Sequence, residues 1–206
     1  MNLSAVLLAG GESRRMGEDK ATVCFEGIPL WRRQIELLRS MHPIEILISA
    51  RTDPGWRPPD TKFVADIPPS RGPISGLAVA IEMMQGTHLL ALAVDMPLMT
   101  SSQLGAVSNL ANNSVGVLPT IGNRAEPLAA VYPRESLPHF SAALRGNDFS
   151  LQRLTRGLIQ AGLLTVVSVS ESEAEVYRSL NMPEDLDLEP HFPARSLESR
   201  RITTEG

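Results

Sequence analysis

The sequence is poor in the residues that build disulfide scaffolds and zinc sites. Its 206 residues include one cysteine, Cys24, and four histidines. A single cysteine excludes an internal disulfide, and the histidines are scattered without the spacing of a helical zinc site. We therefore expect Cys24 to be a small buried thiol.

The chain also lacks an excess of basic residues, and its first residues do not have the pattern that we expect of a targeting segment. Lysine and arginine number 19 against 23 acidic residues, which gives a net charge of -4. Nucleic-acid-binding domains usually carry a basic surface, so we expect no nucleic-acid partner. The apolar run 3–8 has no basic segment before it and is interrupted by Ser4, so it predicts a strand rather than a signal peptide. We expect a cytoplasmic protein with no membrane partner.

Apolar runs of the β type alternate with helical patterns along the chain. Hydrophobic residues make up 43% of the sequence, enough for the core of one large domain. The predicted strands are 5–8, 44–48, 63–65, 89–94, 115–118, 128–132 and 164–169, and the predicted helices are 30–41, 74–85, 137–145, 151–161 and a short helix from 184.

This alternation predicts an α/β fold of three layers, in which helices cover a central sheet. Several strand runs show no polar alternation, as expected for strands covered on both faces. The sheet should be mostly parallel with helices on both faces, and the closely spaced strands between 115 and 132 predict an antiparallel addition. We expect one domain over 1–188 and a flexible C-terminal tail over 189–206, where periodicity is absent.

A glycine-rich segment follows the first strand directly: residues 7–20 read LLAGGESRRMGEDK. Glycines let backbone N–H groups approach a phosphate, and Arg15 and Lys20 can supply compensating charge. Glu12 stands where a dinucleotide-binding fingerprint needs glycine, and 17–19 do not fit a Walker loop. The segment predicts a different phosphate loop, and the alternative is a tight turn with solvated basic residues.

Two carboxylates follow predicted strands. Asp95 comes after the run 89–94, and ligands of open α/β sheets bind outside the carboxyl ends of the strands. Because magnesium prefers one or two carboxylates plus substrate phosphates, Asp95 is the predicted Mg²⁺ ligand; it could instead cap a helix near Thr100 or a turn. Asp66 follows the run 63–65 and could bind a base or ribose, or be an ordinary loop aspartate.

Two predicted helix starts could add further groups to this edge. Gly72 and Pro73 open a helix with proline in the first turn, which would leave unpaired N–H groups directed at a ligand. Asn181 precedes a proline-started helix, and its amide could complete a metal or phosphate site or cap that helix.

Together these segments resemble the molybdenum cofactor guanylyltransferase family, within the nucleotidyltransferases that have a Rossmann-like sheet of the GT-A type. The likeness runs from about 3 to 188. Its motifs occur in the family's order: Leu8-Ala9-Gly10-Gly11, Arg15-Met16-Gly17, Asp19-Lys20, Gly72-Pro73-Ile74-Ser75-Gly76, Asp95-Met96-Pro97 and Asn181-Met182-Pro183-Glu184-Asp185-Leu186.

The resemblance implies transfer of GMP from GTP to the terminal phosphate of molybdopterin or Mo-molybdopterin, with Mg²⁺ as cofactor and release of pyrophosphate. The pair Gly10-Gly11 resembles guanylyl rather than cytidylyl members, which favours GTP over CTP. The implied catalytic residues are Arg15, Lys20 and Asp95, the implied nucleotide-binding residues are Leu8, Ala9, Gly10, Gly11, Lys20, Ser49, Asp66, Gly72 and Asp95, and the implied metal ligand is Asp95.

Three positions depart from the family pattern. Ser49 stands where asparagine is frequent in the nucleotide pocket, Glu126 precedes Pro127 where histidine or glutamine is usual, and Ser179 replaces the first asparagine of an Asn-x-Asn pair. A carboxylate at 126 would repel a phosphorylated acceptor unless it were paired, for instance with Arg124. Glu126 and Asn181 are therefore candidates for the acceptor or metal site.

Two other functions remain open at this point. The chain could transfer another nucleotide or use another acceptor, such as CMP to the pterin or a nucleotidyl group to a sugar or alditol phosphate. It could also be a non-catalytic GTP-binding protein, with the three departures marking a decayed site. In each case we expect a monomer or a weak oligomer.

Overall fold

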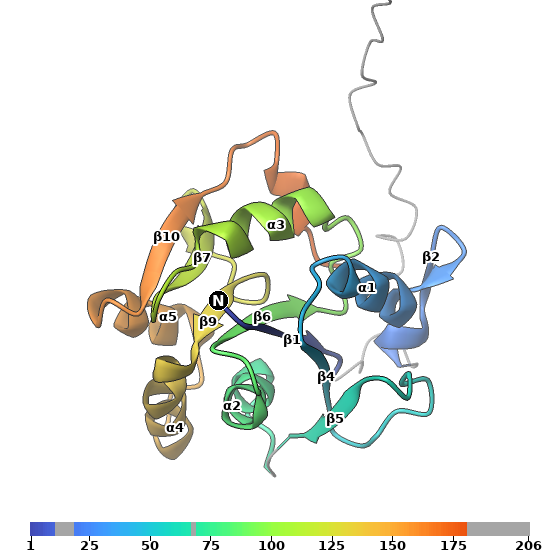
Figure 1. The fold of residues 1–206 in the computed structure, drawn as a ribbon, viewed down its shortest axis with the longest axis horizontal. Helices are drawn as coiled ribbons and strands as arrows, with labels where there is room; N and C mark the ends of the chain where they lie inside the picture. The colour runs from blue at the N-terminus through green and yellow to red at the C-terminus, as the bar shows by residue number, and fades with distance from the viewer. Residues whose placement is uncertain (11–18, 67–68, 181–206) are drawn as a thin grey trace, which may run out of the picture.

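The computed structural model describes residues 1–10, 19–66 and 69–180. Its central feature is a sheet with strand order β10-β7-β9-β6-β1-β4-β5, to which β8 is added by pairing with β7 (Figure 1). The strands are β1 (Leu3–Leu8), β4 (Glu45–Ala50), β5 (Lys62–Ala65), β6 (His88–Ala93), β7 (Gly116–Ile121), β8 (Arg124–Ala125), β9 (Val131–Pro133) and β10 (Leu164–Ser168).

Most strand pairs in this sheet are parallel. Strands β6, β1, β4 and β5 run in one direction, and β10 is parallel to β7. The exception is β9, which lies antiparallel between β6 and β7, and the short β8 is antiparallel to β7. The predicted mostly parallel sheet with an antiparallel addition is therefore confirmed.

Helices cover both faces of the sheet, as predicted. One face packs against α2 (Pro73–Met83), α4 (Leu137–Arg145) and α5 (Leu151–Gln160), and the other against α1 (Leu30–Arg39) and α3 (Ser101–Leu110) (Figure 1). Strands β4 and β6 are buried at every position, which explains why they read as continuous apolar runs. No helix in the described part of the chain is long and apolar enough to cross a membrane.

A small hairpin outside the main sheet contains the cysteine. Strands β2 (Cys24–Phe25) and β3 (Ile28–Pro29) pair antiparallel around Glu26 and Gly27, which have positive φ angles of 51° and 76°. Successive side chains of a strand point to opposite sides, and here Phe25 is buried while Cys24 is exposed. The expectation of a buried thiol was wrong because Phe25 takes the inward position.

Several element boundaries differ from the predicted ones. Helix α3 was not delimited in advance, and the strand predicted over 128–132 is β9, over Val131–Pro133. The remaining short elements are 3₁₀ turns: η1 (Lys20–Thr22), η2 (Arg134–Ser136) and η3 (Ala174–Tyr177). The predicted helix from 184, the domain boundary at 188 and the tail 189–206 lie outside the described residues.

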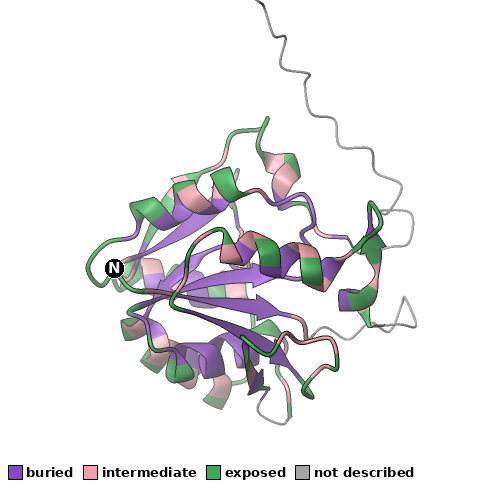
Figure 2. Ribbon diagram, turned by 45° about the vertical axis from the view of Figure 1, so that its right-hand side comes forward, coloured by how far each residue is buried: buried purple, intermediate pink, exposed green. Residues whose placement is uncertain are grey.

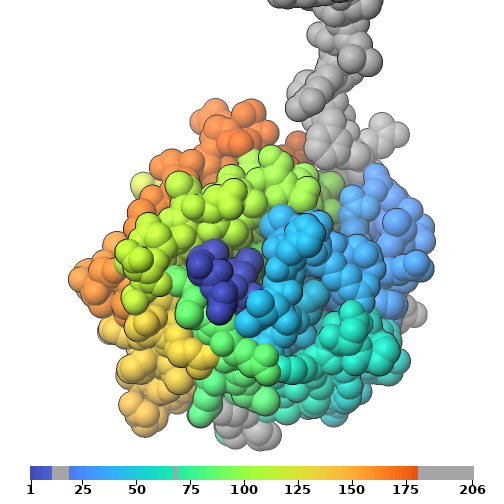
Figure 3. All heavy atoms as spheres, viewed as in Figure 1, coloured from blue at the N-terminus to red at the C-terminus, as the bar shows by residue number. Residues whose placement is uncertain are grey.

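The central parallel strands end along one edge of the sheet, where the site is expected. In Figure 2 the arrowheads of the buried strands point together toward the right-hand side. Figure 3 shows the opposite, amino-terminal face, whose centre is filled by the first residues of the chain, in dark blue, between α1 and α3. At the carboxyl edge, Leu8 of β1 pairs with Ser49 of β4 on one side and with Ala93 of β6 on the other.

Candidate nucleotide-binding site

Lys20 and Asp95 form the charged centre of this edge. Asp95 lies two residues beyond Ala93. The N–H of Val94 donates to the carbonyl of Leu8 at 3.1 Å, so the segment after β6 stays paired with β1. Lys20 begins η1, and its Nζ lies 2.8 Å from Oδ2 of Asp95. Both side chains are largely shielded, with 17% and 21% of their surfaces exposed. The ion pair joins the segment after β1 to the segment after β6.

The second oxygen of Asp95 is chemically unsatisfied within the described chain. Asp95 Oδ1 is buried and has no hydrogen-bond partner among the described residues. A buried carboxylate oxygen without a donor or cation costs free energy. The alternative that Asp95 caps a helix is excluded for α3, because the Thr100 hydroxyl caps that helix by accepting from the N–H of Gln103 at 3.2 Å.

Asp66 lies on the other side of β1, directly after β5. Its Oδ1 accepts a hydrogen bond from the Ser49 hydroxyl at 3.0 Å, and its Oδ2 accepts one from the Ser70 hydroxyl at 3.1 Å. A Cβ added to Gly10 would lie 3.1 Å from Asp66 Oδ2. Asp66 is therefore an anchored, buried carboxylate against the start of the glycine-rich segment, and Ser49 helps to hold it.

Gly72 opens α2 in a conformation that favours glycine. Its φ of 75° lies in the left-handed region, and Pro73 is in the first turn of the helix, as predicted. The N–H of Gly72 donates to the Ser70 hydroxyl at 3.3 Å, and the N–H of Ser75 donates to the carbonyl of Gly72 at 3.0 Å. The expectation of unpaired N–H groups here is thus wrong for these two, because the turn satisfies them itself.

Gly76 provides a stability test of the Asp66 cluster. A Cβ at this position would collide with the Ser49 hydroxyl and lie 3.2 Å from Asp66 Oδ1. We expect Gly76→Ala to destabilise the fold by about 1–3 kcal/mol, as overpacking does, because the Ser49 hydroxyl must turn away from Asp66.

The matched control is Gly105→Ala, in α3, where an added Cβ meets nothing within 4 Å. Alanine there should be neutral or stabilise by roughly 0.5–1 kcal/mol. Chemical denaturation of both variants is the measurement, and equal unfolding free energies for Gly76→Ala and wild type would contradict the close packing described.

Glu126 lies on the far side of Asp95, in the turn between β8 and β9. Two residues later, the carbonyl of Leu128 accepts a hydrogen bond from the N–H of Ala93 at 3.0 Å, so this turn runs along the same edge. Arg124 Nε lies 3.9 Å from Glu126 Oε1, and the arginine side chain is 80% exposed. Burial raises the pKa of Glu126, and Arg124 opposes this only in part. The arginine is therefore a loose partner for a shielded carboxyl.

An indole pair supports the turn that carries Lys20, and sequence reasoning missed it. The rings of Trp31 and Trp56 stack with centroids 5.4 Å apart and an interplanar angle of 15°. Trp56 Nε1 donates to Asp19 Oδ2 at 3.0 Å, while Asp19 Oδ1 accepts from the N–H of Ala21 at 3.0 Å and caps η1. Asp19 thus links the tryptophan pair to the residue beside it, Lys20.

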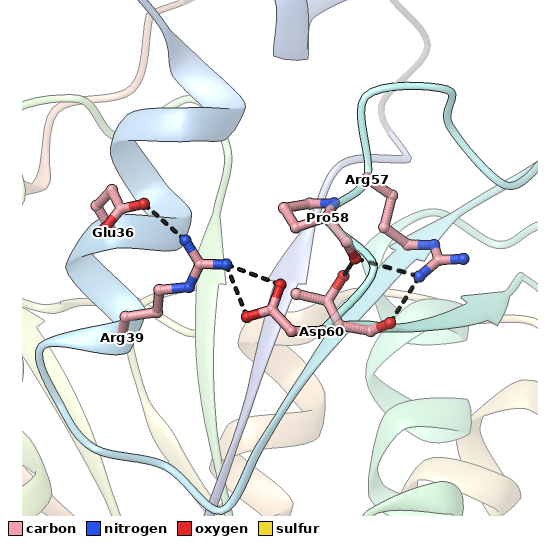
Figure 4. A network of polar contacts seen from close by, with 6 residues as sticks. Glu36, Arg39, Arg57, Pro58 and Asp60 are labelled. Carbon is pink, nitrogen blue, oxygen red and sulfur yellow. Dashed lines mark hydrogen bonds and ion pairs between the residues drawn. The ribbon is translucent and has the colours of Figure 1, made fainter.

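The β4–β5 loop that carries Trp56 is fixed against α1 by the ion pair of Arg39 and Asp60 (Figure 4). Arg39 on α1 binds both carboxylate oxygens of Asp60, at 2.8 and 2.7 Å, and also binds Glu36. Arg57 donates to the carbonyl of Thr61 at 2.6 Å within the loop. Contacts within the loop and with α1 therefore fix the loop conformation in which Trp56 donates to Asp19.

The structure therefore brings most of the described candidates to one edge. Across it, in strand order, lie Asp66, Ser49, the segment Leu8-Ala9-Gly10, Asp95 with Lys20, and Glu126. Gly11, Arg15 and Asn181 lie outside the described residues. A hollow between α4 and α5 is lined by none of the predicted site residues.

The sequence is similar to a known domain family and to named proteins of other organisms. The model of the MobA-like NTP transferase domain matches residues 5–181. A protein of Opitutus terrae named "probable molybdenum cofactor guanylyltransferase" is 33% identical over 91% of this chain and 94% of its own length.

Solved structures share the fold at lower identity. Molybdopterin-guanine dinucleotide biosynthesis protein A from Archaeoglobus fulgidus is 21% identical, with a TM-score of 0.67 over 89% of this chain and 94% of that one. A nucleotidyl transferase from Methanothermobacter thermautotroptrophicus is 18% identical, with a TM-score of 0.70 over 89% and 93%. Since the family model spans most of the sequence, the chain belongs to the family of MobA-like NTP transferase domains.

Proposed function

We propose that the chain transfers GMP from GTP to the terminal phosphate of molybdopterin or Mo-molybdopterin, forming molybdopterin guanine dinucleotide and releasing pyrophosphate. The observation that carries this proposal is the 2.8 Å ion pair of Lys20 and Asp95 beside Leu8, where β1 and β6 end together. Strands β4 and β5 lie on one side of β1 and β6 on the other, and such a switch in strand order is where α/β sheets bind nucleotides.

The order of residues along the edge suggests how GTP would lie. Ser49 and Asp66 are at one end, where the base and ribose would bind, and Lys20 and Asp95 are at the other, where the phosphates would bind. Three strand-to-strand steps of ~4.8 Å separate β5 from β6, so the two ends are about 14 Å apart. Leu8, Ala9, Gly10 and Gly72 line the positions between or beside them. GTP would thus lie across the carboxyl end of β1.

The residues at Asp95 fit a magnesium ion. Its unpartnered, buried Oδ1 is available to a cation, while Lys20 holds Oδ2. The described residues contain no group of three or more His, Cys, Asp or Glu that could hold a metal, and Mg²⁺ often takes one or two carboxylates with substrate phosphates completing its shell. Bound there, Mg²⁺ would neutralise charge on the phosphates during transfer.

In this reaction the protein mainly has to align the acceptor phosphate with the α-phosphorus of GTP. A terminal phosphate oxygen of the acceptor would attack the α-phosphorus of GTP in line, as the bond from the α-phosphorus to the bridging oxygen of pyrophosphate breaks. The acceptor phosphate is already ionised at neutral pH, so no general base is required. Lys20, together with Arg15, would stabilise the charge of the departing pyrophosphate, and the scaffold would supply orientation.

Glu126 is proposed to face the acceptor, with Asn181 as a further candidate for the acceptor or metal site. Because burial raises the pKa of Glu126, a larger share of this side chain is neutral at mildly acidic pH. We expect the acceptor KM to rise as pH increases through the Glu126 titration, since the ionised carboxylate repels a phosphate. Glu126→Gln should lower the acceptor KM at pH 8 and flatten this pH dependence, with the GTP KM unchanged.

The acceptor KM of the wild type and of Glu126→Gln, measured by steady-state kinetics from pH 5.5 to 8.5, would check this prediction. The acceptor's own titration affects both proteins equally, so a difference between their pH profiles reports on Glu126. An acceptor KM with the same value and the same pH profile in both proteins would place Glu126 away from the acceptor.

A panel of GTP, CTP, ATP and UTP with magnesium and molybdopterin, read by pyrophosphate release, tests the proposed function. We expect release with GTP. Preferential release with CTP, or with a sugar or alditol phosphate in place of the pterin, would assign another transfer reaction. Tight GTP binding without turnover on any acceptor would favour the non-catalytic alternative.

A further inference from the structure

Residues 95–97, which begin two positions after the end of β6 at Ala93, each accept a hydrogen bond through the backbone carbonyl. The Asp95 carbonyl accepts from the N–H of Leu180 at 2.8 Å. The Met96 carbonyl accepts from Gln34 Nε2 at 2.6 Å, and the Pro97 carbonyl accepts from Arg33 Nε at 2.7 Å. Two of these three donors are neighbouring side chains of α1. The turn that carries Asp95 is thus anchored to a helix 62 positions away in sequence.

Gln34 is an unusual residue for its position. It is fully buried, within the face of α1 that packs with Leu30, Ile35 and Leu38. Its Oε1 is buried without a hydrogen-bond partner among the described residues. A buried amide with half of its groups unsatisfied destabilises a fold compared with an apolar side chain of similar shape. Packing alone therefore does not account for glutamine here.

We infer that Gln34 is a positioning residue for Asp95: its side-chain N–H fixes the Met96 carbonyl and thereby the peptide that follows the metal- and lysine-binding carboxylate. The inference rests on the role of Asp95 in the proposed function. Asp95 must present Oδ1 outward while Oδ2 meets Lys20, and such an orientation depends on the backbone that follows it. Catalytic groups need this support because displacements of about 1 Å can cost roughly 100-fold in rate.

The substitution Gln34→Met separates this role from a structural one. Methionine has a similar length and no polar group to leave unsatisfied. The Met96 carbonyl keeps its bond from the N–H of Met99 at 3.1 Å, so it is not orphaned. We expect an unfolding temperature equal to or above that of wild type. We also expect kcat to fall by roughly 10-fold or more, with a much smaller change in GTP KM, since the base and ribose end is untouched.

The matched control is Leu38→Met, one turn further along α1 and also fully buried in the same core. It makes a comparable change in packing without touching the turn after Asp95, so kcat should stay at the wild-type value. An unchanged kcat in Gln34→Met, or a loss of kcat accompanied by a lower unfolding temperature, would overturn the inference.

A binding readout keeps this test separate from that of the proposed function. The magnesium concentration needed for half-maximal GTP binding should rise in Gln34→Met, whereas GTP binding without magnesium should not change. If wild type binds magnesium-GTP but transfers nothing, the proposed function fails while this readout still decides on Gln34: a shifted magnesium dependence supports its role and an unshifted one overturns it. A wild-type protein that binds no magnesium-GTP overturns both.

Discussion

Asp95→Asn is expected to lower nucleotidyl transfer by roughly 100-fold or more, the usual scale for losing one key electrostatic group. The amide preserves the shape of the side chain but removes its charge. It replaces one carboxylate oxygen by an N–H donor, either facing Lys20 at 2.8 Å or at the buried position of Oδ1. Magnesium-dependent pyrophosphate release, measured at saturating GTP and acceptor, should therefore collapse while the fold remains.

The control for this change is Glu82→Gln, the same carboxylate-to-amide change at an exposed glutamate near the C-terminal end of α2. It should leave turnover at the wild-type rate. Circular dichroism and thermal unfolding would verify that both variants are folded. Unchanged pyrophosphate release in Asp95→Asn would refute the assignment of this carboxylate to the metal and nucleotide.

Lys20→Met should lower nucleotidyl transfer by a similar factor, because it removes a positive charge from the proposed phosphate site. Removing the ammonium takes away the charge that would stabilise the leaving pyrophosphate and deprives Asp95 Oδ2 of its partner. We expect kcat to fall by about 100-fold, and the GTP KM to rise because phosphate binding is weakened.

Lys20→Arg is the informative companion, since it keeps the charge in a different geometry and should retain intermediate activity. The measurement is kcat and KM for GTP with saturating magnesium in all three proteins. If Lys20→Met retained the wild-type kcat, Lys20 would be a structural partner of Asp95 and not a phosphate-binding residue.

The strands of the central sheet could be predicted because burial on both faces leaves a strong signature. Strand β6 was expected over 89–94 and is found at His88–Ala93, buried throughout. Helix α3 leaves a weaker signature, since only Leu104, Val107 and Ser108 of its ten residues are buried. The hairpin β2–β3 turns on Glu26 and Gly27, which is not one of the usual sequence signals for a tight hairpin.

Only the part of the candidate site that follows from general rules about parallel sheets could be predicted from the sequence. The position of Asp95 at the carboxyl edge follows from the strand that precedes it. Its contact with Lys20 joins residues 75 positions apart, and the bond from Trp56 to Asp19 spans 37 positions. No local pattern encodes these approaches, because they depend on how α1 and the β4–β5 loop pack in three dimensions. The role of Gln34 was missed for the same reason, since its contact with the Met96 carbonyl joins residues 62 positions apart.

The most direct test of the account is incubation of the full chain with magnesium-GTP and molybdopterin, followed by mass analysis of the products. The account predicts molybdopterin guanine dinucleotide together with one equivalent of pyrophosphate, and neither product when magnesium is chelated. Intact GTP and unmodified pterin, after incubation with protein shown to be folded, would contradict it.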